Sequence, residues 1–333
     1  MTQSLPLVSI VMCCYNGAHF IPRAFASVLN QTYNNIELIF VNDGSTDNTI
    51  EVAESYLSKF GDRGYSLKII SQENHGLGHA CATGLQHIKG EFLSYLDVDD
   101  TIMATSIEEK AIFLINNTKY NVVRTNAYVV NSDNIDDTSR RLVNNPIEKS
   151  SEFIFYDLLF GRTNNFAGTY MIRTLPFREF YATKQAPISR YGQNLQLLLP
   201  LTYNTPCGFI DKPLFKYIKH PSSHSAATSL DKEIDLHNGY WDIRYKMLEL
   251  MDINDKQLTQ DLKIQNIKNI IYCTIHHSNV EQFNSYYKEL KELGGNTFEF
   301  KVYNANMNRK KTRFLYRVLF FFYRHLCPQN LAY

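Results

Sequence analysis

The sequence has little tryptophan, little net charge and no long apolar run. Its 333 residues include one Trp and carry a formal net charge of +1. This balance argues against a nucleic-acid-binding protein, in which Lys and Arg are in excess. Met1–Leu5 lacks the basic and apolar character of a signal peptide. No apolar run reaches the roughly 20 residues that a membrane-spanning helix needs.

The cysteine pattern argues against a metal site and against a disulfide-bonded fold. The six cysteines show neither the spacing of a metal site nor that of a disulfide framework. Cys13 and Cys14 are adjacent within an apolar run, so their side chains should point to opposite faces of a strand. The pattern predicts a reduced, cytoplasmic protein.

The first hundred residues alternate between strand-like and helix-like segments. Four apolar runs predict strands, and they are Val8–Cys14, Ile36–Val41, Ser66–Ile70 and Phe92–Val98. Helical patterns follow at Pro22–Leu29, from about Asn48, and at Ala82–Ile88. This alternation predicts a doubly wound, Rossmann-like α/β sheet, which binds ligands beyond the carboxyl ends of its strands. Tyr15, Asp43 and Asp97 follow three of these strands and should converge there.

Three carboxylates follow the fourth strand. Asp97 and Asp99 are two residues apart, so in extended chain both would point to one face. Two such carboxylates repel each other unless a cation lies between them, and oxygen ligands favour Mg²⁺ or Mn²⁺. An Asp-rich turn that merely closes a strand is the alternative, and Asp97–Asp100 by itself does not decide between them.

The spacing of four blocks resembles family-2 glycosyltransferases. The blocks are Val8–Gly17, Val41–Asp47, Asn74–Gly84 and Gly90–Asp100. The resemblance implies a GT-A fold and a hexosyltransferase that moves a sugar, with inversion, from a nucleotide diphosphate donor. It also implies Mg²⁺ or Mn²⁺ at a DXD motif. It favours a UDP-sugar as donor and a glycan or lipid-linked acceptor in polysaccharide biosynthesis. The lack of membrane spans argues against a processive synthase that exports its own polymer.

Individual residue roles follow from the same resemblance. The nucleotide-sugar site would be formed by Cys14, Tyr15, Asn16, Asp43, Gly44, Asn74, Gly76 and Asp97. Within it, Asp43 would contact the base and Asp97 the ribose side. Asp99 would ligate the metal with Asp97, and Asp100 would hold the metal or meet the acceptor.

The segment Gly192-Gln193-Asn194 departs from the family pattern. Most relatives carry Gly-Glu-Asp here, and that Asp is the general base, whereas amides cannot accept a proton at ordinary pH. The chain is then either an inactive sugar-nucleotide-binding homologue or an enzyme in which Gln193 and Asn194 orient the acceptor. We favour the second because the acidic motif is intact. A second departure is Cys81, which follows Ala80 where relatives often carry Arg.

Other candidate residues lie later in the chain. A histidine completes the metal sphere in some relatives, and His224 is the first candidate, with His220 second; both could equally be exposed loop residues. A nucleotidyltransferase with the same sheet topology is a further alternative. It would need a basic Gly-rich phosphate loop after the first strand, and Cys14–Gly17 does not supply one.

The chain is predicted to have a GT-A domain over residues 1–228 and a helical accessory region over residues 229–333. Residues 309–326 form a basic, amphipathic segment, with Lys310, Arg313, Arg317 and Arg324 on one side and aromatic residues on the other. Such a helix suits an anionic membrane surface, which would place the protein peripherally on the inner face of the cytoplasmic membrane. The alternative is a helix packed on the protein's own core.

Truncation after Ala305 tests the membrane interpretation. Each Lys or Arg near an anionic surface adds about 1 kcal/mol to binding. The truncated chain should therefore no longer sediment with anionic liposomes, yet should still hydrolyse a soluble donor. Precipitation or unfolding of the truncated chain would show that the segment belongs to the core.

Overall fold

The computed structural model describes residues 5–189, 191–221 and 229–306. This part of the chain divides into two compact units. The first contains the described residues up to Leu158 together with Asn165–His220, and the second contains Leu159–Asn164 and the described residues from Pro221 onward. His224 and residues 309–326 lie outside the described residues.

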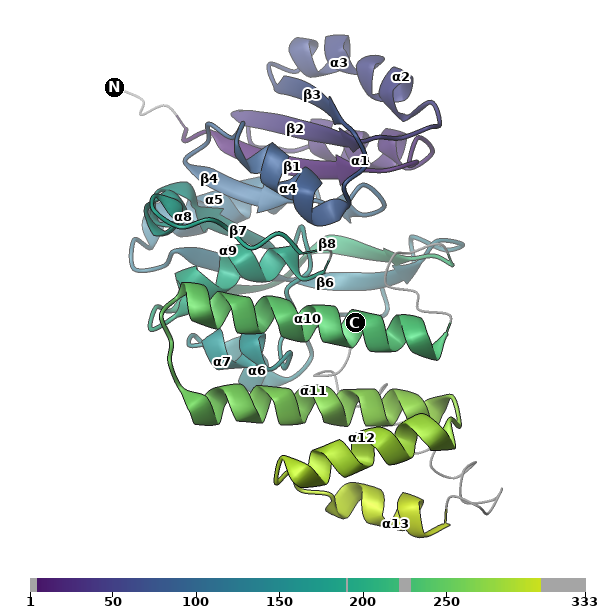
Figure 1. The fold of residues 1–333 in the computed structure, drawn as a ribbon. Coiled ribbons are helices and arrows are strands. Elements are labelled where there is room, and N and C mark those ends of the chain that lie inside the picture. Colours follow the sequence, from purple (N-terminus) through teal and green to yellow (C-terminus); the bar gives the residue numbers. More distant parts are fainter. Residues whose placement is uncertain (1–4, 190, 222–228, 307–333) are drawn as a thin grey trace. The chain divides into compact units, whose positions relative to one another are not determined.

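The first unit is built on one mixed sheet (Figure 1). Its strands are β1 (Val8–Cys14), β2 (Ile36–Asp43), β3 (Ser66–Gln72), β4 (Phe92–Tyr95), β5 (Thr101–Ile102), β6 (Val122–Asn131), β7 (Tyr170–Arg173) and β8 (Cys207–Lys219). The spatial order is β3-β2-β1-β4-β7-β6-β8-β5. The four predicted strands are confirmed and run parallel to one another. Beyond β4 the sheet becomes mixed, because β7 is antiparallel to both β4 and β6.

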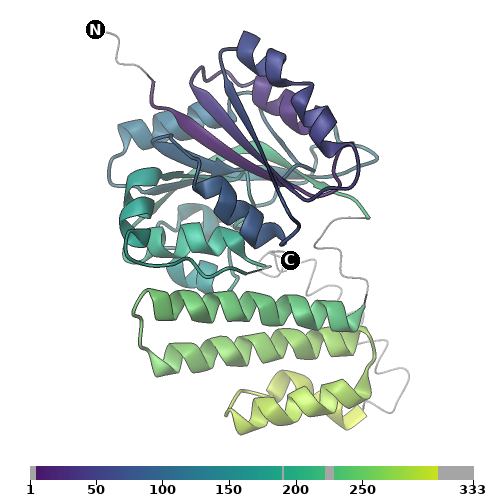
Figure 2. The same ribbon diagram turned by 45° about the horizontal axis from the view of Figure 1, so that its top comes forward.

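In the described part of the chain, nine helices start within the first unit. They are α1 (Ile21–Leu29), α2 (Thr49–Glu54), α3 (Leu57–Asp62), α4 (Leu77–Leu85), α5 (Ser106–Asn116), α6 (Pro146–Ser150), α7 (Phe155–Leu159), α8 (Thr174–Tyr181) and α9 (Gln193–Thr202). Figure 2 shows the strands lying between α4 and the pair α2 and α3. The sheet is therefore covered on both faces, as continuous apolar strands require.

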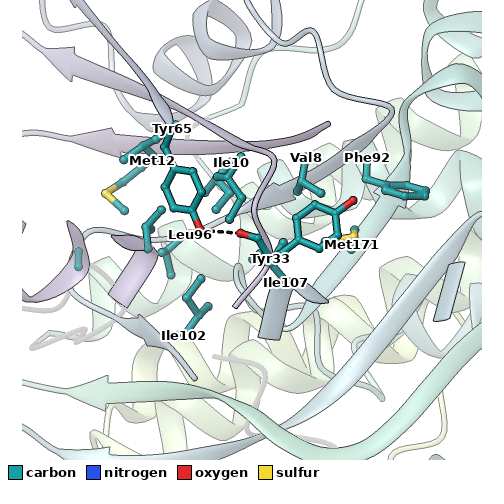
Figure 3. Packing of buried hydrophobic residues seen from close by; sticks show 14 of the residues in the cluster. Val8, Ile10, Met12, Tyr33, Tyr65, Phe92, Leu96, Ile102, Ile107 and Met171 are labelled. Atoms are coloured by element: carbon teal, nitrogen blue, oxygen red, sulfur yellow. Dashed lines mark hydrogen bonds between the residues drawn. The ribbon is translucent and has the colours of Figure 1, made fainter. Parts of the chain in front are cut away.

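Alternate residues of β1 separate the two faces. Val8, Ile10 and Met12 join a core with the buried residues of α1, α2, α3 and α5, part of which Figure 3 shows. Val11 faces α4, where a Cβ added to Gly84 would lie 2.6 Å from its Cγ1. Glycine at position 84 thus lets α4 approach the strand closely. The predicted helix at Ala82–Ile88 starts five residues earlier, at Leu77.

A buried polar cluster holds the chain where it enters β4. Glu37 is 5% exposed, and its Oε1 accepts hydrogen bonds from Ser9 Oγ (2.6 Å) and Lys89 N (2.6 Å). Gly90 N donates to Ser9 Oγ at 2.8 Å. A buried carboxylate must be hydrogen-bonded to be tolerated. The cluster therefore connects the first residues of β1 and β2 to the turn before β4.

The second unit contains four helices in its described part. They are α10 (Leu230–Leu250), α11 (Lys256–His276), α12 (Val280–Glu292) and α13 (Phe298–Asn306). Their core includes Ile271, Phe283, Leu290 and Tyr303. The helical character predicted for residues 229–333 is confirmed over their described part, residues 229–306. No helix in the described ranges is long and apolar enough to cross a membrane.

Lys110 is a charged residue inside the first unit. It lies on α5, is fully buried, and donates from Nζ to the Gly168 carbonyl at 2.8 Å. Burial lowers its pKa to about 7. An unfolded lysine titrates near 10.4, so between these values the unfolded chain binds the extra proton. Stability contributed by this group therefore rises with pH across that window.

Replacement of this lysine should remove that pH dependence. From pH 7 to pH 9 the group should add about 2 kcal/mol to the free energy of unfolding of the wild type. Lys110→Met should lose this increment, as measured by urea denaturation followed by circular dichroism at the two pH values. The exposed Lys59→Met is the control and should keep it. An equal rise in Lys110→Met would refute the assignment.

Candidate functional site

The carboxyl ends of β1, β2 and β4 lie at the same edge of the sheet, because the three strands are parallel neighbours. Tyr15, Asp43 and Asp97 follow these strands, and the structure brings the three loops together there. Tyr15 is 53% exposed and lies open to solvent. The convergence expected from the sequence is thus present in the fold.

The loops after β1 and β2 are joined through Asn16. Its Oδ1 accepts from Thr46 N at 2.7 Å, and its backbone N–H donates to Ser45 Oγ at 2.9 Å. Asn16 has a φ of 50°, in the left-handed region that Asn tolerates better than most residues. Unlike Asn16, Cys14 has its side chain buried in the core. This burial raises the pKa of the Cys14 thiol to about 11. Its thiol therefore does not face the crevice.

Asp43 fixes the loop that leads into α4. Its Oδ1 accepts from Gln72 Nε2 at 2.7 Å and from His75 N at 3.1 Å, while its Oδ2 accepts from Gly76 N at 2.8 Å. Gly44 has a φ of 71°, and a Cβ there would lie 2.6 Å from Asn74 N. Asp43 and Gly44 thereby hold the segment Asn74–Gly76 against the end of β2.

The residues next to this loop belong to α4 or lie just before it. Gly76, with a φ of 88°, is the residue that precedes the first turn of α4. His75 and His79 are exposed, with ring centroids 5.6 Å apart. Cys81, at the position where relatives often carry Arg, is buried, and its Sγ lies 3.6 Å from that of Cys13. Cys81 thus packs against the sheet.

The three aspartates form a turn and not an extended strand end. β4 stops at Tyr95, Leu96 N donates to Val11 O at 3.0 Å, and Asp100 N donates to Asp97 O at 3.1 Å. The expectation that Asp97 and Asp99 share a face of extended chain is therefore wrong. Burial and, after it, the charge of Asp99 raise the pKa of Asp97 to about 7, so the two carboxylates still influence each other.

Each aspartate of the turn has a different environment. Asp99 Oδ2 lies 2.9 Å from His220 Nε2, and the Asp99 carbonyl accepts from Arg23 Nη2 at 2.6 Å. Asp100 is 2% exposed and accepts from Ile218 N at 2.7 Å. Burial, with the charges of Asp99 and Asp97, raises the pKa of Asp100 well above its usual value. Asp100 therefore ties the turn to β8, while the carboxylate of Asp99 stays partly exposed.

The segment Gly192-Gln193-Asn194, which departs from the family pattern, lies at the start of α9. Gly192 precedes the helix in a left-handed conformation (φ 72°), and Gln193 is the first residue of the helix. Asn194 Oδ1 accepts a hydrogen bond from Tyr170 Oη. Tyr170 is fully buried at the start of β7, and burial, with Cys81 and Asp97 nearby, raises its pKa well above the usual range. The hydroxyl therefore remains a donor and fixes the orientation of the Asn194 amide.

Arg23 and Tyr170 are not among the residues that the sequence predicts for the site, and His220 is its second histidine candidate. His220 is 121 residues from Asp99, and Tyr170 is 24 residues from Asn194. Tyr170 lies in an ordinary strand pattern and Arg23 in an ordinary helix pattern. No local signal distinguishes either of them from a structural residue.

Comparison with known proteins agrees with this architecture. The structure of S. aureus TarS residues 1–349 with UDP-GlcNAc matches with a TM-score of 0.63 and 17% identity, covering 96% of this chain and 92% of that one. The mannosyltransferase PcManGT from Pyrobaculum calidifontis, with GDP-Man and Mn²⁺, matches with a TM-score of 0.56 and 13% identity, covering 98% and 87%. The GT-A fold implied by the motifs is confirmed.

Sequence comparison gives the family. An uncharacterized glycosyltransferase of Rickettsia felis is 43% identical over 111 residues, which are 33% of this chain and 17% of that protein. Such matched segments span less than half of the length of the curated relatives. The family model described as Glycosyl transferase family 2 matches residues 9–178, just over half of the chain. The chain therefore belongs to glycosyl transferase family 2.

Proposed function

We propose that this protein transfers a sugar from a nucleotide-diphosphate donor to a glycan or lipid-linked acceptor, with inversion at the anomeric carbon. The observation that carries the proposal is the acid turn Asp97–Asp100, held beside the Asp43 loop at the carboxyl edge of the sheet. A uridine donor is favoured, since TarS, with a TM-score of 0.63, binds UDP-GlcNAc in its structure.

The residues present fit a divalent metal ion. Burial and, after it, the charge of Asp99 raise the pKa of Asp97 to about 7, and a bound cation would favour the ionised carboxylate. Within the described residues, Asp97, Asp99 and His220 do not bring three ligand atoms within 4.8 Å of one another. Asp99, with His220 beside it, would therefore hold Mg²⁺ or Mn²⁺ together with donor phosphates, a common arrangement for Mg²⁺. The Mn²⁺ in the PcManGT structure supports this choice.

The chain's own residues supply binding and orientation. Asn16, Asp43 and Gly44 shape the loops against which the nucleoside would lie, with Tyr15 exposed beside them. A bound divalent ion would offset the negative charge that develops on the departing diphosphate. Asn194, oriented by Tyr170, and Gln193 would hold the acceptor hydroxyl by hydrogen bonds. Neither amide can act as the base.

The alternative is a sugar-nucleotide-binding homologue without transferase activity. Its support is the same pair of amides, Gln193 and Asn194, at the place where most relatives carry a catalytic carboxylate. Donor turnover in the presence of an acceptor separates the two functions, since binding without turnover would favour the inactive homologue.

Substitution in the acid turn tests the metal assignment. Asp99→Asn should lower Mg²⁺- or Mn²⁺-dependent donor turnover by about 100-fold or more, because it removes a charge aimed at the metal. Asp97→Asn should raise the KM for the donor without lowering the thermal midpoint, since burial already disfavours this carboxylate. The exposed Asp62→Asn is the control. Full activity of Asp99→Asn in the presence of a chelator would refute the metal assignment.

Substitution at Asn194 tests the role of the amides. Asn194→Asp should reduce transfer about tenfold, because it adds a charge beside the buried Tyr170 hydroxyl and alters the group that meets the acceptor. Tyr170→Phe should cause a similar loss, equivalent to one hydrogen bond of roughly 1 kcal/mol. The exposed Tyr156→Phe should have no effect. Higher activity in Asn194→Asp would instead show that this is a decayed base site.

A further inference from the structure

A second cluster of metal-ligating side chains lies in the helical unit. Glu233 is in the first turn of α10, His276 is the last residue of α11, and His277 follows it. One ligand atom from each of the three lies within 4.8 Å of the others. The pair His277 Nε2 and Glu233 Oε1 is 3.5 Å apart. None of these residues belongs to the site at the sheet edge.

The packing of two helices brings these residues together. Figures 1 and 2 show α10 and α11 side by side and antiparallel, so the start of one lies beside the end of the other. The backbone at the end of α11 is fixed, since His277 N donates to Cys273 O (3.0 Å) and Asn279 N to Thr274 O (2.9 Å). The two imidazoles therefore project from a rigid helix end.

The chemistry of the cluster differs from that of the acid turn. Glu233 is only 6% exposed, and buried carboxylates are paired or coordinate metals. Two imidazoles and one carboxylate suit Zn²⁺ and related transition ions, whereas Mg²⁺ prefers oxygen ligands alone. Bonds of about 2.0–2.2 Å to a tetrahedral ion put ligand atoms about 3.2–3.6 Å apart. The 3.5 Å pair already fits this spacing.

The orientation of the rings is also suitable. The imidazoles of His276 and His277 have centroids 5.0 Å apart and planes at 84°. Perpendicular rings can direct one nitrogen each toward a common point without stacking. The wider pairs of the cluster would need to close by about 1 Å, which side-chain rotation can supply.

We propose that Glu233, His276 and His277 bind one Zn²⁺ ion, with a water molecule as the fourth ligand. The ion would neutralise the buried carboxylate and join the start of α10 to the end of α11. The rival explanation is an ion pair of Glu233 with protonated His277, which the carboxyl end of α11 would also favour. An ion pair needs no metal, so metal binding distinguishes the two.

The test is a Zn²⁺ titration of the untagged, full-length chain after removal of metals with a chelator. Excess Mg²⁺ is present throughout to occupy oxygen-ligand sites, and a chromophoric chelator reports free Zn²⁺. We expect one equivalent of Zn²⁺ to bind. His276→Ala and Glu233→Gln should each weaken this binding about tenfold or more. His87→Ala, whose ring contacts Lys68 in the first unit, should bind as the wild type does.

A second measurement guards against variants that fail to fold. Co²⁺ added to the wild-type chain should give visible absorption bands of a site with nitrogen and oxygen ligands, and one equivalent of Zn²⁺ should remove them. Far-ultraviolet circular dichroism establishes whether each variant is folded. Binding of no Zn²⁺, or equal binding by the wild type and folded His276→Ala and Glu233→Gln, would overturn the proposal.

Discussion

The position of the acid turn depends on the hydrogen bonds that the buried carboxylate of Glu37 accepts. Its Oε1 accepts from Ser9 Oγ and Lys89 N, and so connects β1, β2 and the entry to β4. A slip of β4 by one residue would break this cluster and turn every side chain of the strand to the opposite face. Such a slip would also move Asp97 away from the loops that follow β1 and β2. A polar cluster at one end of the strands thus fixes the geometry at the other end.

Two kinds of carboxylate occur at the functional edge, and hydrogen bonding separates them. Asp43 accepts from the backbone of His75 and Gly76 and from Gln72, so its charge is used to hold a loop. Asp97 is buried near the charge of Asp99, and both raise its pKa to about 7. The first environment favours a rigid binding surface, and the second favours a bound cation. The proposed function rests on this contrast.

The sequence predicted the first half of the fold well because its signals are local. Continuous apolar runs such as Val8–Cys14 are typical of buried parallel strands, and the polar residues that follow them lie at the carboxyl edge in any such sheet. The motif blocks added the family, which the match over residues 9–178 confirms. The mixed second half was not predicted, since the antiparallel pairing of β7 with β4 joins segments about eighty residues apart and leaves no local pattern.

The sequence by itself determined the strands, the loops that follow them and the types of residue at the site edge. Only the tertiary structure decided which of these residues meet. His220 contacts Asp99, Tyr170 orients Asn194, and Glu233 lies beside His277, although each pair is separated by many residues. It also decided that Asp97–Asp100 is a turn, through the bond from Asp100 N to Asp97 O. Periodicity reports the face of an element that is buried, but it contains no information about the partner that buries it.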